Sequence, residues 1–116
     1  LNRTYVSPAV LTFAVTSTYD FGVIPVGGSA DATMVINKSG GANATAVTIT
    51  GLPAPFTIKG GTFPGTGGTC TTTITASCTI VLTYTPTSGV TSNSFATVQY
   101  NNGSSTVTTS RAITGT

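Results

Sequence analysis

The segment spanning residues 69–86 constrains the fold most strongly, because it contains both cysteines and the clearest strand of the chain. Within it, residues 79–85 alternate regularly, so that Ile80, Leu82 and Tyr84 share one face and mainly threonines occupy the other. The proline that follows has no N–H to donate to a sheet, so the strand is predicted to end there. The segment therefore predicts a core β-strand bordered by a short loop between two cysteines.

The composition extends this prediction to the whole chain of 116 residues, which has the length of one ordinary domain. Threonine is the commonest residue, and its branched Cβ favours extended backbone, whereas the strong helix formers are scarce or scattered. Regularly spaced Val, Ile, Phe and Tyr residues indicate a folded core despite a charged fraction of only 5%. The composition predicts an all-β domain.

Turn signals recur about every ten residues, which is typical of an immunoglobulin-like, seven-stranded antiparallel β-sandwich. Residues 1–8 are predicted to be a lead-in or linker, and residues 9–116 a single domain. The Tyr19-Asp20-Phe21-Gly22 run predicts a turn, and Asn102-Gly103 predicts a tight hairpin turn. The predicted strands cover residues 9–16, 31–37, 46–51, 56–59, 79–85, 94–100 and 105–113.

An ordered set of short motifs carries a family resemblance along nearly the whole chain after residue 9. The motifs are Tyr19-Asp20-Phe21-Gly22, Val26-Gly27, Asn37-Lys38-Ser39-Gly40-Gly41-Ala42, Gly51-Leu52-Pro53-Ala54-Pro55-Phe56, Cys70 with Ser77-Cys78-Thr79, Tyr84-Thr85-Pro86, Tyr100-Asn101-Asn102-Gly103 and residues 111–116. Their order and spacing resemble the ASPM/SPD-2/Hydin-type immunoglobulin-like domain, in the choice-of-anchor D form that repeats along bacterial surface proteins. The resemblance implies a seven-stranded sandwich used as a tandem module, with no catalytic residues.

Cys70 and Cys78 are open to three interpretations, namely a structural disulfide, a metal pair or a redox pair. A zinc site needs four ligands, and the chain has no histidine and no carboxylate near the cysteines. Seven intervening residues also differ from the spacing of redox pairs. A disulfide is the favoured interpretation, and it indicates an oxidising, extracellular compartment.

The sequence gives no positive signal for catalysis, for a metal or for any other cofactor. Without histidine, the chain cannot form a Ser-His-Asp or Cys-His arrangement. Asp20 and Asp31 are isolated from one another in the sequence, which is untypical of calcium sites and of paired-carboxylate glycosidases. A net charge of +2 without a basic cluster argues against nucleic acid, and no apolar run is long enough for a transmembrane helix.

Aromatic side chains are the remaining candidates for ligand contact. A core of this size needs several of the nine Phe and Tyr residues, and the chain has no Trp. Phe63, in a long Gly-rich loop, and Tyr100 are the predicted ligand contacts, because loops on a rigid sandwich are where recognition usually occurs.

Together these patterns favour a non-enzymatic, extracellular module of a bacterial surface protein or fibre, acting as a structural spacer that supports cell adhesion. Its expected partners are neighbouring modules of the same polypeptide. The alternative is a terminal recognition domain that binds a glycan or another surface ligand of a host or prey cell. A homo-oligomer is compatible with either hypothesis.

Overall fold

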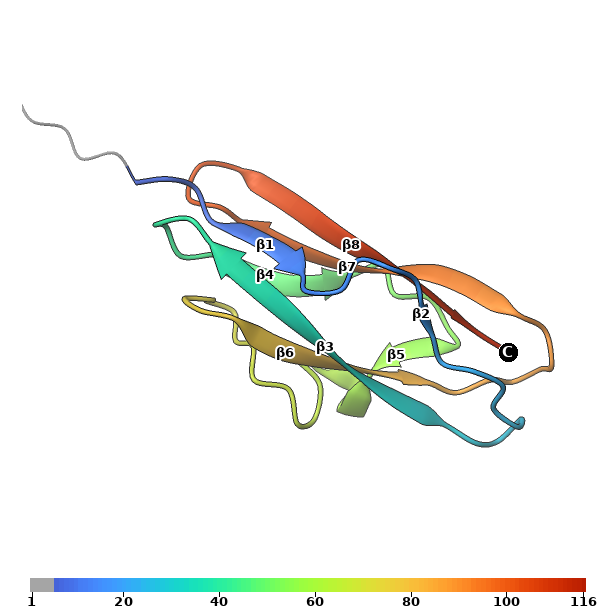
Figure 1. Ribbon diagram of the computed structural model, residues 1–116. Coiled ribbons are helices and arrows are strands. Elements are labelled where there is room, and N and C mark those ends of the chain that lie inside the picture. Colours follow the sequence, from blue (N-terminus) through green and yellow to red (C-terminus); the bar gives the residue numbers. More distant parts are fainter. Residues whose placement is uncertain (1–5) are drawn as a thin grey trace, which may run out of the picture.

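The computed structural model describes residues 6–116 and shows two four-stranded sheets around one hydrophobic core. The first sheet has the order β1-β3-β6-β5, and the second has the order β2-β8-β7-β4 (Figure 1). The strands are β1 (Val10–Phe13), β2 (Tyr19–Asp20), β3 (Ala30–Ser39), β4 (Thr45–Thr50), β5 (Phe56–Ile58), β6 (Cys78–Tyr84), β7 (Ser92–Asn101) and β8 (Thr106–Gly115), with one 3-10 turn, η1 (Lys59–Gly61). The prediction of a nearly all-β domain is confirmed.

Strand alternation decides which side chains form the core. In β3, every second residue is buried, while the residues between them are exposed. In β6, Ile80, Leu82 and Tyr84 are fully buried, as the period of two predicts. The core residues come from both sheets, so their buried faces lie against one another in a sandwich-like arrangement.

The N-terminal part of the chain differs from the prediction. The described residues contain eight strands rather than seven, because Tyr19–Asp20 forms a short strand where the sequence predicted a turn. This strand pairs with β8 in parallel, which departs from the predicted antiparallel sandwich. The predicted first strand, residues 9–16, is shortened to Val10–Phe13, because the chain leaves the first sheet after β1 and joins the second sheet at β2. The chain still turns directly after this short strand. There, the Gly22 N–H donates to Asp20 Oδ1 at 2.8 Å, so the Asp20 side chain bonds to the backbone two residues further on.

The predicted lead-in, residues 1–8, lies partly outside the described residues. Of the remainder, Ser7 is attached to the loop between β3 and β4, since its carbonyl and hydroxyl oxygens accept N–H bonds from Ala42 and Gly41. Ala9 is already buried, and its N–H donates to the Asn102 carbonyl at 3.0 Å. The chain thus enters the core beside the β7–β8 hairpin turn.

The β7–β8 hairpin forms where Asn102-Gly103 predicted it. Gly103 has a φ of +101°, which an L side chain rarely adopts. Asn102 closes the turn, because its N–H donates to the Ser105 carbonyl and its Oδ1 accepts from the N–H groups of Ser104 and Ser105. The two long strands that this turn joins, β7 before it and β8 after it, pair over ten residues and form the centre of the second sheet.

Candidate functional site

A disulfide joins Cys70 and Cys78, as predicted, and the loop that it closes contacts both sheets. At the edge of β6, the N–H groups of Thr69 and Cys70 both donate to the Thr79 carbonyl at 3.0 Å. At the edge of β4, Ala44 and Ile74 exchange two backbone hydrogen bonds, and the Val47 N–H donates to the Thr72 carbonyl. The disulfide loop therefore ties the first sheet to the second along this side of the molecule.

The Gly-rich segment before the disulfide loop also lies along the edge of β6. The Val81 N–H donates to the Pro64 carbonyl, so residues 64–70 continue along the β6 edge where β5 has ended. A Cβ on Gly65 would lie 2.3 Å from the Val81 carbonyl oxygen, so only glycine permits this approach. Val81 is consequently 5% exposed although it points away from the core. Residues 64–70, which the sequence predicts as a loop, therefore cover the edge of β6 that β5 leaves unpaired.

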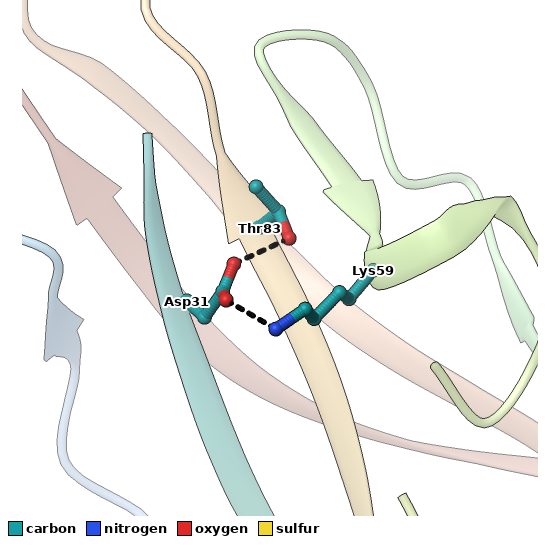
Figure 2. Close-up of polar contacts among 3 residues, drawn as sticks. All are labelled: Asp31, Lys59 and Thr83. Carbon is teal, nitrogen blue, oxygen red and sulfur yellow. Dashed lines mark hydrogen bonds and ion pairs between the residues drawn. The ribbon is translucent and has the colours of Figure 1, made fainter. Parts of the chain in front are cut away.

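Three polar side chains form the clearest electrostatic cluster on the first sheet (Figure 2). Asp31 in β3 and Thr83 in β6 are register partners, and the Thr83 hydroxyl donates to Asp31 Oδ1 at 2.8 Å. Lys59 Nζ, from the start of η1, lies 2.7 Å from Asp31 Oδ2. The hydrogen bond from Lys59, followed by that from Thr83, lowers the pKa of Asp31 from its ordinary value of 3.8.

This cluster links β3, β6 and the start of η1. Both charged side chains are 41% exposed, so water screens their attraction and the pair contributes little to stability. A lowered carboxyl pKa makes Asp31 a poorer proton acceptor at neutral pH, which is the opposite of what a general base requires. The local sequence does not predict this ion pair, because Asp31 and Lys59 lie 28 residues apart.

Arg111 of β8 carries a charge but is largely buried, with an exposed fraction of 9%. Its Nε donates to the Ser17 carbonyl at 2.8 Å, and its guanidinium carbon lies 5.4 Å from the Tyr19 ring centroid. These contacts fix the crossover between β1 and β2 against β8. Arg111 thus has a structural partner on each side and is not an exposed anion-binding group.

The structure does not bring the two predicted ligand contacts together. Tyr100 is 4% exposed in β7, and its hydroxyl accepts a hydrogen bond from the Leu11 N–H at 3.0 Å. This burial removes Tyr100 from the candidate contacts, since its ring packs between the sheets. Phe63 lies in the loop after η1 and is half-buried against the core, so its role in ligand contact stays a prediction.

The hollows of the described surface include three with volumes of about 200, 240 and 300 Å³. One of about 200 Å³ is lined by the disulfide loop, residues 69–78, and one of about 240 Å³ lies beside the β7–β8 turn. The third, about 300 Å³, is largely apolar and is lined by Ile49, Leu52, Phe56, Thr57, Ile58 and Gly61. None of the three gathers carboxylates, cysteine thiols or basic side chains among its lining residues.

No group of three or more His, Cys, Asp or Glu side chains that could hold a metal ion occurs in residues 6–116. Across the same residues, no helix is long and apolar enough to cross a membrane. No protein-family model and no curated protein sequence matches this chain.

Proposed function

We propose that this chain is a non-enzymatic, immunoglobulin-like module of a bacterial surface protein or fibre, in which it acts as a spacer that supports adhesion. The strand order supports the fold assignment. In immunoglobulin-like sandwiches, the first, second, fifth and fourth strands form one sheet, and the third, sixth and seventh form the other. The order found here follows that scheme if β1 and β2 together count as the first strand, divided between the two sheets.

The parallel pairing of β2 with β8 is the observation that carries the spacer function. Because the first and last parts of the chain run in the same direction, the polypeptide enters at one end of the domain and leaves at the other (Figure 1). Ala9 is hydrogen-bonded beside the β7–β8 turn, and β8 runs ten residues away from that turn, which is about 30 Å. A module with this geometry extends a tandem array by its full length.

The same pairing suits the module to carry tension. Force applied at the two chain ends acts along β2 and β8 and shears all their hydrogen bonds at once. These bonds continue past the strand, with Phe21 donating to Thr114 and Ile24 donating to Thr116, both at 2.8 Å. The Thr116 N–H also donates to the Gly22 carbonyl at 3.0 Å. The disulfide adds support for an oxidising environment outside the cell.

Single-molecule pulling tests this proposal with the protein as its own control. In one geometry, force is applied through the two termini, which loads β2 against β8 in shear. In the other, it is applied through residue 6 and Ser104, which lie at the same end of the domain, so the strands open one bond at a time. The terminal geometry should require the larger unfolding force. An equal or smaller force through the termini would contradict a load-bearing spacer.

The alternative function, a recognition domain at a fibre tip, depends on a surface aromatic. Of its two predicted contacts only Phe63 reaches the surface, and it is half-buried. No arrangement around Phe63 favours one ligand class, so the spacer is the function that the geometry supports best.

A further inference from the structure

The N-terminal segment is attached to the domain in two separate places. β1 pairs with β3 in the first sheet, and β2 pairs with β8 in the second (Figure 1). Residues 14–18 connect the two strands, and all five of these residues are exposed. β1 is also an edge strand, so its departure would leave the seven-residue pairing of β3 with β6 in place.

The backbone of β1 bonds to both sheets. On one side, β1 pairs with β3 over four residues, and the Ala14 N–H continues this pairing by donating to a β3 carbonyl at 3.0 Å. On the other side, the Ala9 and Leu11 N–H groups donate to the β7–β8 turn and to the Tyr100 hydroxyl. Ladder hydrogen bonds run across the strand direction, so a pull along β1 loads them together in shear.

Force on the N-terminal end of the domain reaches β1 before it reaches β2, because it passes along the backbone in chain order. While β1 stays bonded, it transfers the load to β3 and to the β7–β8 turn. The start of β2 has its own anchor, since Arg111 Nε donates to the Ser17 carbonyl and the guanidinium lies over the Tyr19 ring. The pairing of β2 with β8 therefore carries the full load only after β1 has separated.

We propose that β1 is a releasable strand, which separates from the domain as a unit under tension while β2 stays paired with β8. This release rests on the proposed spacer function, because only a module under tension experiences it. The bonds of Phe21 and Ile24 to the end of β8 remain in the released state. Leu11 and Phe13, which are 1% and 3% exposed in the folded domain, lose their burial, so the hydrophobic effect returns β1 when tension falls.

The register sets the length of this first extension. Ala9 lies beside the β7–β8 turn, and Tyr19 pairs with Ile113, which is seven residues beyond the start of β8. The two positions are therefore about 23 Å apart along the sheet. Ten residues of extended chain span at most about 33–36 Å, so release should lengthen the domain by on the order of 10 Å. Unfolding of the remaining domain should add on the order of 300 Å, which makes the two events distinct.

Single-molecule pulling at slowly rising force tests the proposal with two attachment points. With force through residue 6 and the C-terminus, a reversible step of about 10 Å should precede the main unfolding event. With force through Thr18 and the C-terminus, β1 lies outside the loaded chain. The short step should then be absent, and the main event should occur at a similar force. Thr18 is exposed, so attachment there leaves the core intact.

A proline in β1 provides an independent check. Thr12 is exposed and lies two residues before Ala14, so alternation directs its N–H to β3 as well, and Thr12→Pro removes that bond. This variant should lower the force of the short step or abolish it, and leave the main event unchanged. Thr16→Pro, which lies outside both strands, is the matched control and should leave both events unchanged.

Three outcomes overturn the proposal. They are a single unfolding event with force through residue 6, a short step that persists with force through Thr18, and a Thr12→Pro variant that weakens only the main event. None of them decides whether the module bears load, because that is measured by the force of the main event when the termini and the opening geometry are compared.

Discussion

The Tyr100 hydroxyl accepts a hydrogen bond from the backbone N–H of Leu11 at 3.0 Å, across 89 residues of sequence. Both residues are buried, and they belong to different sheets, so this bond joins the sheets inside the core. It also satisfies a backbone donor of β1. Tyr84, the other core tyrosine, differs in this respect, because its buried hydroxyl has no hydrogen-bond partner within residues 6–116.

This difference predicts opposite effects for the same substitution. Tyr100→Phe leaves a buried N–H unpaired and should lower the free energy of unfolding by about 1–3 kcal/mol. Tyr84→Phe removes a hydroxyl that gains nothing from the fold, so its free energy of unfolding should be unchanged or up to ~1 kcal/mol higher. Urea unfolding of both variants at one temperature measures the difference. A larger loss for Tyr84→Phe than for Tyr100→Phe would contradict this account of the core.

The disulfide should contribute measurably to stability. The Cys70→Ala/Cys78→Ala double variant should lose about 2–3 kcal/mol of unfolding free energy in the chain-entropy model for so short a loop. Mass spectrometry without reductant should find both thiols blocked in the wild type, and reduced wild type should unfold at the same urea concentration as the double variant. Equal stability of oxidised and reduced protein would show that the loop connects the sheets without the covalent bond.

Two glycines of the Gly-rich segment before the disulfide loop allow backbone strain to be separated from steric contact. Gly65 and Gly67 have φ values of +94° and +88°, but a Cβ would meet the Val81 carbonyl at Gly65 and open space at Gly67. Gly67→Ala should cost about 1–2 kcal/mol for the left-handed backbone alone. Gly65→Ala adds overpacking and should cost roughly 2–5 kcal/mol. Equal losses in thermal or urea unfolding would mean that residues 64–70 do not pack against β6 in solution.

Asp31 should give a small stability effect at acid pH. The pKa of Asp31 is lowered from its ordinary value of 3.8 in the folded state. The ionised carboxylate therefore stabilises the fold at pH values above 3.8, and this contribution is lost as the pH falls through the lowered pKa. Lys59→Met removes the main cause and should raise the pKa of Asp31 towards 3.8, as carboxyl-carbon NMR titration would show. Lys38→Met, in which the removed ammonium bonds the Gly40 carbonyl, should leave the Asp31 titration unchanged.

Much of the local structure follows from the sequence alone, because it depends on neighbouring residues. The alternation of Ile80, Leu82 and Tyr84 predicts a strand with one buried face, since successive side chains point to opposite sides. Asn102-Gly103 predicts the hairpin, because this pair adopts the positive φ of a tight turn. The two cysteines predict their own disulfide because a short loop keeps them close and the chain offers them no metal-ligand partner.

The tertiary structure decided what depends on residues far apart in the chain. Alternation divides β7 into two faces, but only the arrangement of the sheets decides that Tyr100 is buried and Phe95 exposed. The ion pair between Asp31 and Lys59 and the contact between Arg111 and the Tyr19 ring form only when the strands are paired. The parallel pairing of β2 with β8 also has no local signal, since two residues carry no period and their partners lie at the other end of the chain. Local backbone preferences thus determined the strands and turns, whereas the packing of one sheet on the other determined which surfaces remain available for function.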